Sequence, residues 1–137
     1  MHNIDHTVIA SIVVSFLSYC FGVVTPALEF LMWCIILDVI LGILASFINP
    51  NLMFNSRTLF RGIVKKIVLL SMVAFSKHLD ILMGSEIIGM TTVYFFIINE
   101  GMSVLEEAGK CGINLPPVIK NSLAQLKEIT TNEHERH

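Results

Sequence analysis

Carboxylate, amide and hydroxyl side chains interrupt an apolar stretch of this chain where burial makes them costly. The run 95–107 contains Asn99, Glu100, Ser103 and Glu106. At helical spacing Asn99, Ser103 and Glu106 share one face, and Glu100 lies one step to the side. A buried Asn–Glu pair in lipid persists only where it faces protein or water, so we expect this helix to have partners and these groups to act in assembly.

A further carboxylate, Asp38, lies near the middle of the apolar stretch 27–48, on one helical face with Gly42 and Ala45. Small residues let another helix approach closely, and Asp38 can then hold the contact by hydrogen bonding. In the alternative interpretation, a Lys or Asn of the same bundle satisfies Asp38. The sequence leaves both interpretations open.

Two lysines lie where they can neutralise carboxylates in the apolar segments. Lys66 can extend its long side chain along an apolar surface, and we expect it to pair with Glu100. Lys77 precedes Asp80 by three positions, a spacing at which helical side chains meet, and can pair with it.

Other chemistry is not indicated by the residue pattern. His78 and Asp80 form a lone His-x-Asp with too few ligands nearby for a metal site. The cysteines, Cys20, Cys34 and Cys111, are odd in number and lack metal-site spacing, which argues against a disulfide framework. A Gly-rich phosphate loop, a nucleophile–base pair and a basic-aromatic patch are all missing from the sequence. We therefore expect neither an enzyme nor a nucleic-acid-binding protein, and no cofactor.

The composition indicates a bilayer as the solvent of this chain. Hydrophobic residues make up 54% of the 137 residues and charged residues 15%, against about 25% charged residues in soluble domains. The mean hydropathy is +0.73. The N-terminus has no Lys or Arg before its apolar stretch and no small-x-small cleavage site after it, so we expect the first segment to be retained.

The predicted fold is an all-α integral membrane protein with about four transmembrane helices arranged as two helical hairpins. Thr25-Pro26 and Gly84-Ser85-Glu86 provide the two reversals within the hairpins, and Asn49-Pro50-Asn51 ends the second helix. A stripe of Ile119, Leu123 and Leu126 predicts a short amphipathic helix in the tail, lying on the membrane or on a neighbouring helix. The expected organisation is a transmembrane domain 1–112, with spans at about 8–24, 27–48, 63–83 and 87–107, and a cytoplasmic tail 113–137.

The basic residues predict the orientation. Arg57, Arg61, Lys65 and Lys66 follow the second span and are expected to anchor the protein at the inner interface. Three lysines and an arginine lie in the C-terminal part, whereas the other two short loops contain no basic residue. The positive-inside rule therefore places both the N- and the C-terminus in the cytoplasm.

Several motifs in this order and spacing resemble the phage-lysis and toxin-secretion holin family. The motifs are Leu37-Asp38-Val39-Ile40-Leu41-Gly42-Ile43-Leu44-Ala45, Phe60-Arg61-Gly62-Ile63-Val64-Lys65-Lys66, His78-Leu79-Asp80, Ile98-Asn99-Glu100-Gly101-Met102-Ser103-Val104-Leu105-Glu106, Gly112-Ile113-Asn114-Leu115-Pro116 and the Leu-x-x-Leu-Lys of residues 123–127. The most specific of them is Asn-Glu-Gly-x-Ser-x-Leu-Glu.

The resemblance implies a protein of the bacterial cytoplasmic membrane, of phage or prophage origin. Such a protein accumulates in the bilayer and then forms homo-oligomeric pores or lesions. These release an endolysin, with which direct contact is not required, or a folded toxin.

Two other classes of membrane protein remain open from the residues themselves. A small transporter would use Asp38 and Glu100 as a proton or cation relay. A non-conducting secretion-assembly protein would need neither carboxylate to titrate.

Overall fold

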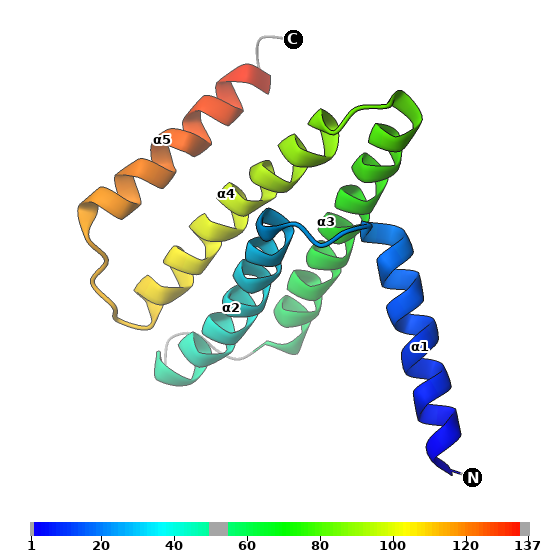
Figure 1. The fold of residues 1–137 in the computed structure, drawn as a ribbon. Coiled ribbons are helices and arrows are strands. Elements are labelled where there is room, and N and C mark those ends of the chain that lie inside the picture. The colour runs from blue at the N-terminus through cyan, green and yellow to red at the C-terminus, as the bar shows by residue number, and fades with distance from the viewer. Residues whose placement is uncertain (1, 50–54, 135–137) are drawn as a thin grey trace.

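A computed structural model describes residues 2–49 and 55–134, and in this part of the chain every regular element is an α-helix. Three helices, α2 to α4, form a bundle, from which α1 diverges and along which α5 lies (Figure 1). The elements are α1 (His2–Phe21), α2 (Pro26–Ile48), α3 (Ser56–Met83), α4 (Ile87–Lys110) and α5 (Pro117–His134). The all-α prediction is confirmed for the described residues.

The start of α2 and the end of α3 are formed by residues with helix-capping properties. The Thr25 hydroxyl accepts a hydrogen bond from the Leu28 N–H at 3.3 Å, and Pro26 opens α2, as predicted from the Thr-Pro pair. Gly84 ends α3 in the left-handed conformation, with φ of 63°, which an L side chain rarely adopts.

The start of α3 differs from the prediction. The sequence placed Arg57 and Arg61 in a loop before a helix at 63, but α3 begins at Ser56, where Asn55 caps it by accepting from the Arg57 N–H at 3.0 Å. Hydropathy marks only the apolar part of a helix, so polar first turns were missed. The two arginines therefore lie on a rigid helix with fixed spacing.

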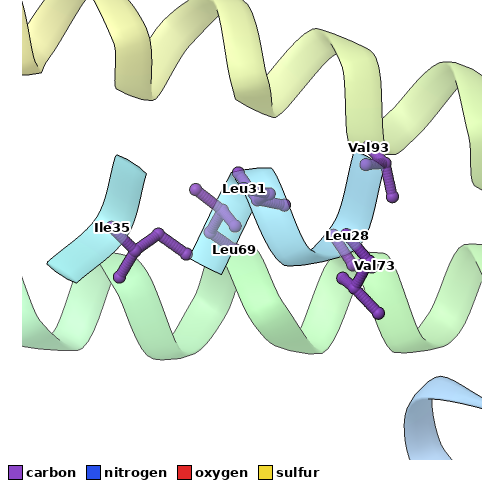
Figure 2. Close-up of a cluster of buried hydrophobic side chains, with 6 residues drawn as sticks. All are labelled: Leu28, Leu31, Ile35, Leu69, Val73 and Val93. Carbon is purple, nitrogen blue, oxygen red and sulfur yellow. The ribbon is translucent and has the colours of Figure 1, made fainter. Parts of the chain in front are cut away.

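A small apolar core joins the three central helices. Leu28, Leu31 and Ile35 of α2 pack with two residues of α3 and one of α4 (Figure 2). Their spacing of three and four positions places them on one face of α2. The remaining core members are Leu69 and Val73 of α3 and Val93 of α4. This core aligns the helices so that polar residues further along them meet.

The first of the two predicted hairpins is wrong in its packing. The chain reverses after α1, yet α1 contacts α3 and makes no packing contact with α2 (Figure 1). The Tyr19 and His78 rings lie 5.4 Å apart where α1 meets α3. The second hairpin is confirmed, since α3 and α4 pack along each other after the turn at Gly84.

The tail forms a helix, α5, that begins at Pro117 and extends further than the predicted amphipathic segment. It packs on α4 and on no other described helix, running back along α4 in the opposite direction (Figure 1). This contact fits the predicted position on a neighbouring helix, and the position on the membrane stays a prediction.

Two of the described helices, α2 and α4, are long and apolar enough to cross a membrane. The apolar part of α1 is shorter, at His6–Phe21, and α3 carries Lys66, Lys77 and Asp80 along its length. Large apolar side chains face outward on every helix of the bundle, as expected where lipid is the solvent. Four spans remain a prediction.

Candidate functional site

A cluster of three charged side chains lies between the bundle helices. The Lys66 ammonium of α3 is 2.8 Å from Oδ2 of Asp38 in α2 and 2.5 Å from Oε2 of Glu100 in α4. The side chains are only 8–14% exposed. The predicted Lys66–Glu100 pair is confirmed, and the same lysine pairs with Asp38, where it satisfies one of the two carboxylate oxygens.

The cluster is not balanced in charge, because one ammonium serves two carboxylates. Oδ1 of Asp38 is buried and has no hydrogen-bond partner among the described residues. Burying a charge without a partner is unfavourable in protein and in lipid alike. The three charges are therefore held together by tertiary packing, with an unsatisfied acceptor left on Asp38.

A cleft of about 470 Å³ leads to this cluster from the end of the bundle where α2 ends and α3 begins, which we call the basic end. Its walls are apolar, from side chains such as Val39 and Ile63, and its polar lining includes Asp38, Lys66 and Glu107. The cleft opens where α2 and α3 pack only sparsely against each other. It gives small polar groups a path to Asp38.

The face of α2 that carries the small residues lies against α4 of the same chain, and their role in close packing stays a prediction. Ala45 is buried, and a Cβ on Gly42 would lie 3.9 Å from the carboxylate carbon of Glu107. Glu107 itself pairs with Lys110 at 2.6 Å. A contact between copies through Asp38, Gly42 and Ala45 stays a prediction.

The polar face predicted on α4 is divided by the fold. Glu100 is buried, whereas Asn99 and Glu106 are exposed and Ser103 is half-buried. The predicted burial of Asn99 together with Glu100 is wrong, because adjacent helical residues point about 100° apart and only Glu100 faces α2 and α3. Asn99 and Glu106 thus lie on the outer surface of the protomer.

Asp80 has a role that the sequence analysis missed. Its carboxylate accepts hydrogen bonds from the backbone N–H groups of Ile88 at 3.0 Å and Gly89 at 2.6 Å, at the start of α4. The expected pair with Lys77 is not formed, and Lys77 makes no ion pair with any described residue. A Cβ on Gly89 would lie 2.8 Å from Oδ2 of Asp80. The local signal was an Asp before a short turn with Gly near the start of the next helix.

The four predicted basic anchors divide into two groups. Arg57, Arg61 and Lys65 are exposed and make no ion pair within the described residues. Lys66 is not an interface anchor, because it lies inside the charge cluster.

The histidine and cysteine side chains that the sequence offered for a metal site or disulfides form neither among the described residues. His78 places Nδ1 2.8 Å from the carbonyl oxygen of Ala74. Among the described residues there is no group of three His, Cys, Asp or Glu side chains suited to a metal. Cys20, Cys34 and Cys111 are free thiols.

Known proteins resemble this chain along most of its length. An uncharacterized protein of Listeria innocua is 33% identical over 120 residues, which are 87% of this chain and 84% of that protein. The probable holin of Bacillus phage phi105 is 28% identical over 120 residues, 87% of each chain. An uncharacterized 14.9 kDa protein of Clostridium perfringens is 32% identical over 111 residues, 80% of this chain and 83% of that protein. No solved structure matches.

The motifs of the charge cluster lie inside the region that carries a family signature. The Bacteriophage holin family matches residues 15–128, a range that includes Asp38, Lys66 and Glu100. This range covers most of the chain, and the chain therefore belongs to the bacteriophage holin family.

Proposed function

We propose that this chain is a holin of a bacterial cytoplasmic membrane. It accumulates in the bilayer, oligomerises, and opens lesions that release an endolysin or a folded toxin. The observation that carries the proposal is the Asp38–Lys66–Glu100 cluster in a chain of this family, because it gives apolar helices a buried polar contact that can be exchanged. Neither catalysis nor direct contact with the endolysin is part of the proposal.

The cluster supports a mechanism with two states. Apolar helices gain little by associating in lipid, so association depends on close packing and on buried polar contacts. In the single copy, Lys66 pairs with a carboxylate of α2 and with one of α4, and the protein accumulates without exposing these charges to lipid. In an assembly, the same groups turn to water or to a neighbouring copy, where the cost of holding charge in hydrocarbon is removed.

The proposal includes four spans, with both termini and the basic end on the cytoplasmic side, and it therefore requires that α5 leaves α4 in the bilayer and lies at the inner membrane surface. Helix α1 has 20 residues, enough for about 30 Å of helix, and α3 has 28. Exposed Arg57, Arg61 and Lys65 at the basic end support this orientation.

Cysteine labelling in intact cells tests the orientation. Single cysteines at Asn3 and at Asn132, in a chain without its native cysteines, are expected to resist a membrane-impermeant thiol reagent until the cells are opened. Labelling of either position from outside contradicts the arrangement. In particular, labelling at Asn3 alone indicates that α1 does not cross.

Lysis of an inducible bacterial strain tests the function. Expression together with a cytosolic muralytic enzyme is expected to give a delay and then abrupt loss of membrane potential and turbidity. Without the enzyme, the potential should collapse while turbidity persists. Glu100→Gln keeps the shape of the side chain and removes its charge, so it should insert normally and lyse late or not at all. Normal timing and normal oligomers in this variant would remove Glu100 from the mechanism.

A small proton- or cation-coupled transporter is the second candidate, supported by the cleft that reaches Asp38 from the basic end. Asp38 and Glu100 would then form the relay through Lys66. In the same strain this function gives gradual, substrate-dependent flux at low copy number, without enzyme-dependent lysis. A secretion-assembly protein gives neither response.

A further inference from the structure

The cleft at the basic end, taken together with the charge cluster behind it, carries more negative than positive charge. Its polar groups and those of the adjoining cluster include three carboxylates, of Asp38, Glu100 and Glu107, and the ammonium groups of Lys66 and Lys110, which leaves a net charge of −1. Asp38 lines the cleft, and its buried Oδ1 lacks a partner among the described residues. A positively charged group entering the cleft would balance this charge.

Three positive charges without an ion pair among the described residues lie on the opposite side of the same helix. Arg57, Arg61 and Lys65 recur every four positions on α3 and are all exposed. At about 100° per residue they point away from the side of α3 on which Gly62 and Lys66 line the cleft. We call this exposed side, with Arg57, Arg61 and Lys65, the basic face.

The cleft and the basic face lie at the same end of the bundle. The basic face occupies the first turns of α3, and the cleft is lined by residues of those same turns, together with the last turns of α2 and α4. Two copies side by side in one membrane therefore present the two surfaces at the same depth. Like surfaces would repel, whereas the basic face of one copy and the cleft of another attract.

We propose that copies of this chain associate head to tail, with the basic face of one copy seated on the carboxylate-lined cleft of the next. Each copy then uses two different surfaces, and such a heterologous contact repeats into a ring or an open array rather than stopping at a dimer. The inference rests on the proposed function, since it describes how the proposed lesion assembles. The partner is a second copy of the full chain.

Disulfide cross-linking between two differently tagged copies tests the arrangement. Ile43→Cys places a thiol on the cleft, and Val64→Cys places one on the basic face without removing a charge. Both are made in a chain with its three native cysteines replaced by alanine, and accumulation in the membrane is checked first. Mixed copies are expected to form cross-linked dimers, while copies carrying the same cysteine are not. Equal cross-linking of like and unlike copies, or none in the mixture, overturns the head-to-tail contact.

The charge contribution is tested in the same mixture. Arg61→Gln with Lys65→Gln in the Val64→Cys copy should lower the cross-linking yield by about fivefold, as expected for the loss of exposed ion pairs. Lys120→Gln, at an exposed lysine of α5 without an ion pair among the described residues, is the matched control and should leave the yield unchanged. An unchanged yield in the double variant overturns the role of the basic face.

Vesicles separate contact between copies from attachment to lipid. In vesicles of phosphatidylcholine alone, the mixed cross-link should form and should still depend on Arg61 and Lys65. A cross-link that requires phosphatidylglycerol and is indifferent to cleft charge shows that the basic face binds anionic headgroups instead, and overturns the proposal.

The lysis assay distinguishes failure of this contact from failure of the proposed function. If the unmodified protein forms oligomers and lyses cells with the enzyme, yet the mixed cross-link is absent, the interface is wrong and the holin function stands. If enzyme-dependent lysis is absent while the mixed cross-link forms in vesicles, the function is wrong and the contact stands.

Discussion

Two regions of the bundle each hold carboxylates away from solvent, but they satisfy them by different means. At one end Asp80 accepts two backbone N–H groups at the start of α4, only eight and nine positions along the chain. In the middle of the bundle, at the inner limit of the cleft from the basic end, Asp38 and Glu100 share Lys66, and these three residues come from three helices. The first arrangement is local and holds the α3–α4 turn. The second depends on the packing of the whole bundle.

This difference indicates which end can change partners. Backbone N–H groups at a helix start stay with the helix, so Asp80 has no alternative partner as good as the present one. The Lys66 ammonium is carried by a flexible stem and serves two carboxylates, one of which keeps an unpartnered oxygen. We therefore expect the Asp80 end to be structural and the charge cluster to be the region that rearranges on assembly.

Substitution of Lys66 should have the largest effect on stability, because the charge cluster depends on it. Lys66→Gln leaves two buried carboxylates without a counter-charge, and the free energy of unfolding should fall by about 3–5 kcal/mol. Unfolding in mixed micelles, followed by circular dichroism, measures it. Lys65→Gln, at the exposed neighbour, is the control and should change the free energy by less than about 0.5 kcal/mol. Equal effects of the two substitutions would show that Lys66 is not the centre of the cluster.

Removing the carboxylates singly and together tests whether Asp38 and Glu100 share the charge of Lys66. Asp38→Asn and Glu100→Gln each leave one acid for one ammonium, so either alone should be tolerated. Together they leave Lys66 without a charged partner, and the loss should exceed the sum of the single effects by about 1–3 kcal/mol. A double-mutant cycle in micelles checks this. Additive effects would mean that Lys66 holds the two carboxylates independently.

Substitution of two glycines of α4 tests the close contact between Asp80 and the start of that helix. Gly89→Ala places a Cβ 2.8 Å from the Asp80 carboxylate, which cannot move away without losing its hydrogen bonds. The substitution should lower the unfolding free energy by about 1–3 kcal/mol. Gly101→Ala meets nothing within 4 Å and should raise it by about 0.5–1 kcal/mol. Effects of the same sign would contradict the close approach at Gly89.

The smallest expected effect is loss of the Asp80 hydrogen bonds alone. Asp80→Ala removes the acceptor at the start of α4 and should lower the unfolding free energy by about 1 kcal/mol. Lysis timing should scale with the remaining protein level and not change otherwise, in contrast to Glu100→Gln. A change in timing at an unchanged protein level would give Asp80 a place in assembly.

Much of the helix organisation was predictable because helix ends depend on nearby residues. Thr25-Pro26 starts α2, Gly84 ends α3 and Pro117 opens α5, each through chemistry within one turn of the chain. The start of α3 was missed because its first turns are polar, although Asn55 provided a capping signal. The number of spans and the orientation remain predictions, since they concern a bilayer.

The sequence by itself determined an apolar all-α chain and its family motifs, and it made Lys66 the expected partner of Glu100, because composition, motif spacing and side-chain reach can be judged along the chain. Only the tertiary structure decided that Asp38 joins that pair, that Asn99 faces outward and that α1 packs on α3 and not on α2. Each of these depends on which faces of distant helices meet. A helical repeat defines the faces available on each helix, but the packing of the bundle selects among them.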